Sequence, residues 1–332
     1  MKITLSHGSG GTETNELINS VFINHFRNEY TSMEDAAILP FGKEKLAFTT
    51  DSYVVEPLFF PGGDIGRLAV CGTVNDLLTT GGKPMYLSAS FILEENLEIE
   101  TLDLIAASMK AAAEEASVKI VTGDTKVIEG NGGVYINTAG IGTAGSVSMG
   151  GSIGTIGDLI AAPGDSILIS GNMGDHHACI MSARMGIKNN IQSDAAPLTE
   201  MVENLLKSGI PVHGLRDITR GGLGTVLNEI TSGLGIGADI HETALPVSKE
   251  VRGLCQILGL DPLYMGNEGK MLVIVPKEHE TEARNIIRSS RYGENAAIIG
   301  SLSEGKGVVL NTKIGGRRLL PALTGEGLPR IC

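Results

Sequence analysis

The sequence predicts an α/β (α+β) protein of two domains followed by a mobile C-terminal tail. The chain has 332 residues, a length that suits about two domains. Strand-like and helix-like segments alternate along it in two sets of similar size. A Gly- and Ser-rich stretch of weak periodicity, 145–157, separates the two sets, as is typical of a boundary. We therefore expect an N-terminal domain at 1–152, a C-terminal domain at 153–322 and the tail at 323–332.

The first set of elements is predicted from hydrophobic periodicity. Its clearest helix lies at 98–117, because Leu102, Ile105, Met109 and Ala112 recur at steps of three and four. The expected order is strand 46–51, helix 65–79, strand 86–93, helix 98–117, and strands 119–122 and 134–143.

The second set contains more helices. Its expected strands are 165–170, 237–241, 270–275, 296–300 and 307–311, and its expected helices are 174–185, 197–208, 221–233, 248–258 and 278–289. The tail has two glycines and a proline and follows neither a helical nor a strand period, so we predict that it is mobile.

Composition and charge narrow the class of partner. Lys and Arg number 26 against 38 Asp and Glu, a net charge of −12, which disfavours binding to nucleic acid or to an anionic membrane. No apolar run approaches the length of a membrane span. The four cysteines lie far apart in the sequence, which favours a reduced, cytoplasmic protein. Glycine, with 45 residues, is about twice as frequent as usual, which suggests backbone close to phosphate.

Four aspartates stand beside glycines, polar residues or the ends of predicted strands, namely Asp35, Asp51, Asp76 and Asp124. Each alone can equally be a cap or turn residue. Asp76 is more informative, because it lies about 200° around its helix from the core residue Val74 and so points away from the core. Carboxylates together with the amide of Asn75 form a set of hard oxygen ligands, which predicts a Mg²⁺ site.

The segment Gly123-Asp124-Thr125-Lys126 is a second candidate for phosphate chemistry. Asp124 and Lys126 are two residues apart, so on a strand they lie on one face. A carboxylate for Mg²⁺ beside a cation for phosphate suits phosphoryl transfer, although a surface ion pair has the same spacing. The chain has no Walker A motif.

Three further segments carry polar or charged groups. Asp217-Ile218-Thr219-Arg220-Gly221-Gly222 precedes a predicted helix, where free N–H groups and Arg220 suit an anion. Glu268 lies in a polar turn between apolar segments. The adjacent histidines of Asp175-His176-His177 diverge by about 100° on a helix, so we expect them to cap or pack rather than to bind metal.

Cys332 is the last residue of the predicted tail. A cysteine there can be accidental, or its thiol can carry an acyl-like group between sites. The other three cysteines have apolar neighbours and are expected in the core.

Taken together, several motifs make the whole chain resemble the HypE family of hydrogenase maturation proteins. The segments that carry the resemblance are 9–11 (SGG), 34–37 (EDAA), 48–55 (FTTDSYVV), 57–66 (PLFFPGGDIG), 74–77 (VNDL), 123–127 (GDTKV), 175–177 (DHH), 219–223 (TRGGL), 267–270 (NEGK) and 329–332 (PRIC). The terminal PRIC is specific to this family, whereas the Asp and Gly elements are shared with a wider superfamily that includes aminoimidazole ribonucleotide synthetase.

The resemblance implies a fold like that of aminoimidazole ribonucleotide synthetase, with two α/β domains. It also implies a homodimer that pairs through the first domain, with ATP bound at domain edges. The implied reaction is that of an ATP-dependent carbamoyl dehydratase, a lyase. A HypF-type carbamoyltransferase loads a carbamoyl group on the terminal thiol, and ATP-dependent dehydration converts this S-carboxamide to a thiocyanate. The cyano group then passes to iron held by a HypC–HypD complex, for the centre of a [NiFe]-hydrogenase.

The resemblance and the residues together assign roles to individual side chains. We expect Asp35, Asp51, Asp76 and Asp124 to hold Mg²⁺, Asn75 and Gly123 to contact the nucleotide, Lys126 to stabilise the transferring phosphate, Glu268 to remove a proton and Cys332 to be the covalent carrier. Glu34, where an Asp is common, and Ile218, where Pro is frequent, depart from the family pattern.

Three alternatives belong to the same superfamily or to another class. A selenophosphate synthetase needs a Cys or selenocysteine in the N-terminal glycine loop, and 7–11 has none. A thiamine phosphate kinase has no use for a terminal cysteine. A non-catalytic, ATP-gated docking protein whose tail binds a partner stays open.

Overall fold

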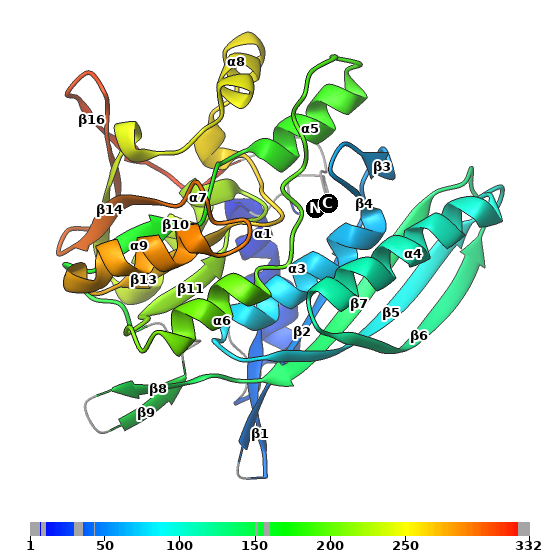
Figure 1. The fold of residues 1–332 in the computed structure, drawn as a ribbon, viewed down its shortest axis with the longest axis horizontal. Coiled ribbons are helices and arrows are strands. Elements are labelled where there is room, and N and C mark those ends of the chain that lie inside the picture. The colour runs from blue at the N-terminus through cyan, green and yellow to red at the C-terminus, as the bar shows by residue number, and fades with distance from the viewer. Residues whose placement is uncertain are drawn as a thin grey trace.

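We describe the protein from a computed structural model, shown in Figure 1. It describes residues 7, 11–29, 36–42, 44–149, 152–155 and 160–324. Two predicted site residues, Asp35 and Cys332, and the predicted tail from residue 325 onward lie outside the described residues.

The N-terminal domain is built on a five-stranded sheet with the order β1-β2-β7-β5-β6. Its strands are β1 (Ala37–Phe41), β2 (Glu44–Tyr53), β5 (Pro84–Glu94), β6 (Lys119–Ile128) and β7 (Val134–Thr143). Only β5 and β6 pair in parallel. Helices α3 (Ile65–Thr79) and α4 (Ile99–Glu115) lie side by side across one face of this sheet (Figure 1). Helical turns precede the sheet at α1 (Thr12–Leu17), a π-helical turn (Ile18–Ile23) and α2 (Asn24–Phe26), and the short hairpin β3 (Phe59–Phe60) and β4 (Gly63–Asp64) precedes α3.

The two faces of the N-terminal sheet differ sharply. Alternate residues of β5, among them Leu87 and Ala89, are buried under the helices. On the opposite face a row of apolar side chains crosses β2, β7 and β5: Phe48, Ile141 and Tyr86 pair in register and are each about 40% exposed (39%, 42% and 43%). An uncovered apolar face of this kind is typical of an interaction surface.

The C-terminal domain contains a seven-stranded sheet with the order β11-β13-β10-β14-β12-β15-β16. Its strands are β10 (Ser166–Ile169), β11 (Gly214–Asp217), β12 (Gly237–His241), β13 (Met271–Val275), β14 (Ala297–Ser303), β15 (Gly307–Asn311) and β16 (Arg317–Leu320), and its helices are α5 (Asp175–Arg184), α6 (Thr199–Lys207), α7 (Gly222–Leu234), α8 (Lys249–Leu258) and α9 (Glu280–Ser289). Short 3₁₀ turns lie at Glu242–Ala244, Pro262–Tyr264 and Lys277–His279. All four residues of β10 are buried, because helices cover both faces of the sheet: Ile167 and Ile169 pack with α7, whereas Leu168 packs in the core that contains α6 and α9.

Helix α3 joins the two domains. Most of its buried apolar residues belong to one continuous hydrophobic cluster that also contains Met201 of α6 and Leu215 of β11. Polar contacts cross the same interface: Arg67 Nε donates to the carbonyl of Ala195 at 2.6 Å, and Glu115 of α4 forms an ion pair with Arg291 at 2.9 Å. The domains therefore share one of the two hydrophobic clusters, whereas the second lies wholly within the C-terminal domain.

Every helix and strand predicted by periodicity is confirmed, and α3, β7, β12 and β15 have the predicted bounds. The sequence did not reveal β1, β11 or β16, the helical turns at 12–26 or the hairpin β3–β4. It also did not reveal the hairpin β8 (Ser146–Met149) and β9 (Ser152–Thr155), which occupies the expected Gly- and Ser-rich boundary. β11 was not predicted because it has only four residues, two of them charged, and so shows no apolar strand pattern. Among the described residues no helix is both long and apolar enough to cross a membrane.

Candidate active site

A cavity of about 200 Å³ opens where the two domains meet. Its lining combines carboxylates, hydroxyls and a guanidinium: Thr49, Thr50, Asp51, Gly72, Asp76, Asp217, Thr219, Arg220 and Glu268. Three of the predicted site residues, Asp51, Asp76 and Glu268, are therefore brought together. Asp217, Thr219 and Arg220, from the segment predicted to bind an anion, join them.

The N-terminal wall of the cavity comes from β2 and α3. Asp51 lies on the stretch of β2 that has only one neighbouring strand, and Asp76 projects from α3 away from the buried Val74, as predicted. Thr49 Oγ1 donates to Asp76 Oδ2 at 2.9 Å, which fixes that carboxylate. Gly72 allows α3 to pack closely against β2, since a Cβ at this position would lie 2.2 Å from the hydroxyl of Tyr53 on that strand.

The C-terminal wall comes from the end of β11 and the start of α7. Asp217 closes β11, and Thr219 and Arg220 follow before Gly221, whose φ of 79° turns the chain into the helix. Burial raises the pKa of Asp217 to about 6, and the nearby negative charge of Asp51 acts in the same direction. The cavity thus combines positive groups, Arg220 and the N-terminal end of the α7 dipole, with several carboxylates. The positive groups suit an anion, and the carboxylates suit a cation bound beside it.

Glu268 is the most deeply buried acid of the cavity, with only 3% of its surface exposed. It lies in the turn before β13, as predicted, and its Oε1 has no hydrogen-bond partner in the part of the chain described. Burial raises the pKa of Glu268 well above its usual range, and the charges of Asp194, Asp51 and Asp217 raise it further. A carboxyl group in this state is a strong base once it is deprotonated.

Asn75 does not line the cavity, in contrast to its expected place beside the nucleotide. Its Nδ2 donates to the carbonyl of Ala196 at 3.0 Å and to that of Glu268 at 3.5 Å, and its Oδ1 accepts from the N–H of Leu198 at 2.9 Å. The amide is engaged at the domain interface, because it lies one residue and about 100° away from Asp76 on α3.

Gly123, Asp124 and Lys126 are also absent from the cavity lining. Asp124 pairs in register with Ser90 on the open face of the sheet, whereas Asp51 shares the helix-covered face with Thr49 and Tyr53. β6 is three strand spacings from β2, roughly 14 Å. Lys126 Nζ and Asp124 Oδ2 form an exposed ion pair at 2.6 Å, and Lys126 lowers the pKa of Asp124. One copy of the chain therefore does not place the four aspartates around one ion.

Within the described ranges no three His, Cys, Asp or Glu side chains converge closely enough to hold a metal ion. Mg²⁺, however, commonly uses only one or two protein carboxylates with phosphate and water, and Asp51 and Asp76 meet that requirement. His176 and His177 pack as expected: His176 Nδ1 contacts Ser193 Oγ at 2.7 Å, and His177 Nδ1 accepts from the N–H of Gly266.

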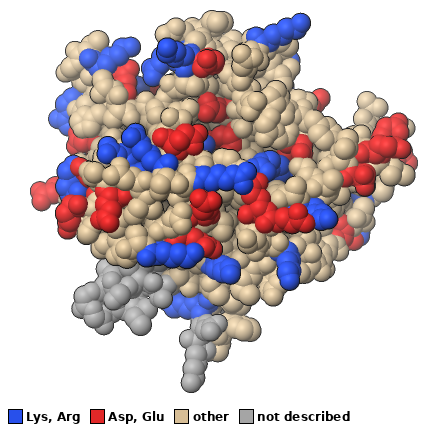
Figure 2. Space-filling model, in the orientation of Figure 1, with Lys and Arg blue, Asp and Glu red and all other residues tan. Residues whose placement is uncertain are grey.

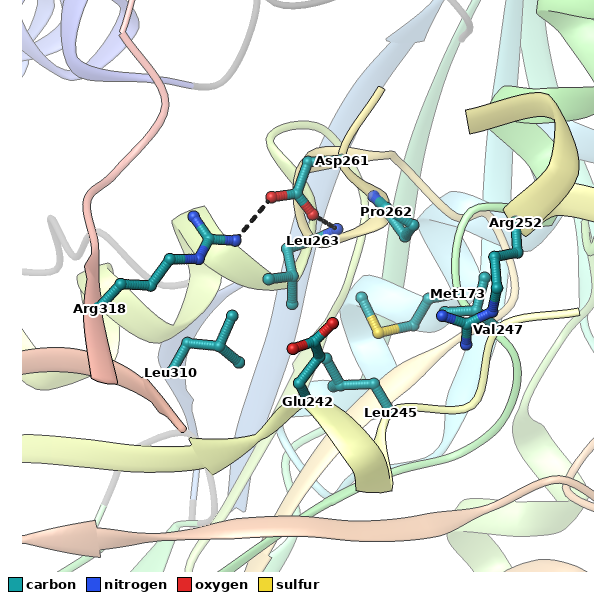
Figure 3. A pocket seen from close by; sticks show the side chains of 10 residues that line it. All are labelled: Met173, Glu242, Leu245, Val247, Arg252, Asp261, Pro262, Leu263, Leu310 and Arg318. Atoms are coloured by element: carbon teal, nitrogen blue, oxygen red, sulfur yellow. Dashed lines mark hydrogen bonds and ion pairs between the residues drawn. The ribbon is translucent and has the colours of Figure 1, made fainter. Parts of the chain in front are cut away.

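Two other cavities have different lining residues from this one. A cavity of about 680 Å³ lies behind the Glu268 turn and has Asp194 and Lys270 in its lining. A hollow of about 140 Å³ has Leu245, Leu263 and Leu310 around it and the Asp261–Arg318 ion pair at its rim (Figure 3). On the face in Figure 2 basic and acidic side chains intermingle, without the broad basic patch expected of a nucleic-acid-binding surface.

Two domains that share a core and meet at an acidic cavity define a protein of the AIR synthase related class. The N-terminal domain of that family matches residues 33–144, and its C-terminal domain matches residues 162–313. Over its full length the chain is 44% identical to the carbamoyl dehydratase HypE of Rhodobacter capsulatus, 98% of which is covered. The chain belongs to the HypE family of carbamoyl dehydratases within that class.

Solved structures of HypE proteins have the same fold. One in a HypE–HypF complex is 46% identical, with a TM-score of 0.85, and the match covers 92% of this chain and 99% of that one. A HypE in complex with ATP is also 46% identical, with a TM-score of 0.81 and complete coverage of both chains. The predicted fold and family are thereby confirmed.

Proposed function

We propose that the protein uses ATP to dehydrate an S-carboxamide on Cys332 to a thiocyanate, which supplies the cyanide ligand of a [NiFe]-hydrogenase. The observation that carries this proposal is the cavity that joins Asp51, Asp76 and Arg220 to the buried base Glu268. The full-length similarity to carbamoyl dehydratases, and to a HypE that binds ATP, supports the same chemistry.

The reaction needs activation of a poor leaving group. Transfer of the γ-phosphoryl group of ATP to the amide oxygen converts that oxygen into part of a phosphate. Loss of both protons from nitrogen, one to Glu268 and the other to water, and departure of phosphate then give S–C≡N, with ADP and phosphate as products. Arg220 and the N-terminus of α7 stabilise charge on the transferred phosphoryl group, and Glu268 accepts a proton.

Magnesium fits the N-terminal wall of the cavity. Asp51 and Asp76 would hold it, with Asp35 as a further proposed ligand, and Thr49 orients Asp76. When bound, Mg²⁺ neutralises charge on the phosphates of ATP. Without it, the carboxylates of the cavity would repel the nucleotide.

A second copy of the chain completes the proposed site. The cavity volume of about 200 Å³ suits the triphosphate end of ATP but is small for a whole nucleotide. Cavity residue Thr50 belongs to the open face of the sheet, the face that carries the apolar row of Phe48, Ile141 and Tyr86. We infer that two N-terminal domains pair through this face, so that the Asp124 and Lys126 of one copy approach the cavity of the other and act on phosphate there.

Replacement of Ile141 by Glu tests the homodimer. Ile141 lies between Phe48 and Tyr86 on neighbouring strands, so a buried charge there should prevent pairing and lower ATP turnover at least tenfold. Analytical ultracentrifugation should give the mass of a single chain. The control is Ile314→Glu, at a side chain 88% exposed in the other domain, which should keep the mass of the pair. A dimeric Ile141→Glu variant would contradict the interface.

We also propose two protein partners for this chain and the cytoplasm as its compartment. A related HypE is found in a complex with HypF, so we propose that a HypF-type carbamoyltransferase loads Cys332. A HypC–HypD complex is the proposed acceptor of the cyano group. Cys71, Cys179 and Cys255 are buried free thiols, which suits the reducing cytoplasm.

Mass spectrometry of the peptide that carries Cys332 tests the reaction directly. After carbamoylation and addition of ATP with Mg²⁺, we expect that peptide to lose the mass of one water. A peptide of unchanged mass in a protein that still forms complexes would instead support an ATP-gated docking protein.

A further inference from the structure

The main chain of Glu268 is held by hydrogen bonds from residues outside its own cavity: Asp194 lines the cavity of about 680 Å³, and Asn75 lies at the domain interface. Asp194 Oδ1 accepts the N–H of Glu268 at 2.9 Å. On the other side of the residue, the carbonyl of Glu268 accepts from the N–H of Ala196 at 3.4 Å and from Asn75 Nδ2 at 3.5 Å. Neither Asp194 nor Asn75 lines the cavity that Glu268 enters. These contacts therefore hold the main chain of Glu268, and with it the direction of the carboxylate, from outside the cavity.

The segment that provides these contacts, 193–198, belongs to the C-terminal domain and is anchored to the N-terminal domain by two hydrogen bonds. The N–H of Ser193 donates to the carbonyl of Pro61 at 2.8 Å, and the N–H of Leu198 donates to Asn75 Oδ1 at 2.9 Å. The Glu268 turn packs directly on it, since a Cβ on Gly269 would lie 2.0 Å from the carbonyl oxygen of Asp194. A shift of 193–198 would therefore move Glu268 with it.

Lys270 allows the Asp194 carboxylate to stay buried. Only 4% of the Asp194 side chain and 8% of the Lys270 side chain are exposed, and Lys270 Nζ lies 3.4 Å from Asp194 Oδ2. Lys270 Nζ also donates to the carbonyl of Gly269 at 3.0 Å. Two buried charges of opposite sign thus brace the turn on the side away from the active site.

We propose that Asp194 and Asn75 are positioning residues that fix the Glu268 carboxylate relative to Asp76. Asn75 and Asp76 are neighbours on α3, and one faces the 193–198 segment while the other faces the cavity. The distance between the Asp76 and Glu268 carboxylates is therefore set through two adjacent residues of one helix. This inference rests on the proposed role of Glu268 as the base.

A pair of double variants tests the hydrogen bond without leaving a buried charge alone. In Asp194→Ala/Lys270→Met the acceptor for the Glu268 N–H is lost, and kcat for thiocyanate formation should fall roughly 100-fold, as for a displacement of about 1 Å. In Asp194→Asn/Lys270→Met the amide oxygen accepts the same N–H, so kcat should recover. KM for ATP should be the same in both, because neither substitution lies in the ATP cavity. Equal kcat values in the two variants would overturn the inference, as would a loss that appears only in KM.

One further variant, Glu268→Gln, separates this inference from the proposed function. Glu268→Gln with wild-type kcat would remove Glu268 as the base, and the inference with it. An inactive Glu268→Gln beside two equally active double variants would overturn the inference alone.

If Asp194→Ala/Lys270→Met does not fold, as judged by circular dichroism, Asn75→Ala serves instead. A loss of kcat at constant KM for ATP then supports the inference, and wild-type kcat overturns it.

Discussion

Cys332→Ala should form no thiocyanate and should bind ATP with the affinity of the wild-type protein. The proposed carrier is the thiol of Cys332, and without it no S-carboxamide can be made, whereas the side chains around the cavity are unchanged. Isothermal titration with ATP and Mg²⁺, and mass spectrometry after carbamoylation, measure the two properties separately. Cys332→Ser should also be inactive, because a hydroxyl is a far weaker nucleophile than a thiol.

The control for this prediction is Cys255→Ala. Burial raises the pKa of the Cys255 thiol to about 11, so at neutral pH it is not a nucleophile, and its loss should leave thiocyanate formation intact. Thiocyanate on Cys332→Ala would refute the carrier role, and a Cys255→Ala protein that cannot be carbamoylated would move that role to the interior thiol.

Asp76→Ala should lose Mg²⁺-dependent ATP turnover by at least about 100-fold. Asp76 is one of two carboxylates proposed for Mg²⁺, and Thr49 holds it in place through the 2.9 Å hydrogen bond. Because the carboxylate is lost rather than a core side chain, the folded state should persist. Phosphate release at a series of Mg²⁺ concentrations measures the effect, and the midpoint for Mg²⁺ should move to higher concentration.

Asp103→Ala is the matched control for Asp76→Ala. Asp103 is an exposed carboxylate on α4 of the same domain and does not line the cavity, so its removal changes the net charge equally. Its ATP turnover should match the wild-type value. Equal turnover by Asp76→Ala and Asp103→Ala would remove Asp76 from the site.

Local periodicity predicted the elements and several orientations but not the neighbours across the domain interface. The helical repeat of α3 correctly directed Asp76 away from the core. It did not show what faces Asn75, because the partner segment 193–198 lies more than a hundred residues further along the chain. The polar turn around Glu268 signalled a site, whereas its burial depends on both domains.

The β6 residues show a second limit of sequence reasoning. Alternation placed Asp124 and Lys126 on one face of a strand, and their ion pair confirms that they share it. Alternation does not tell which face is covered by helices, nor that β6 is at the sheet edge, three strands from Asp51. The order of strands depends on long-range pairing that no local pattern encodes.

The hydrophobic cluster that runs from α3 into α6 and β11 has a consequence for how the protein unfolds. Because this cluster contains residues of both halves, although a second cluster lies wholly within the C-terminal half, the free energy that holds one half together depends on the other. Heating should then give a single calorimetric transition rather than two. A chain cut in the 145–157 stretch should yield fragments that are soluble only when they are produced together, although the family comparison divides the sequence at the same place.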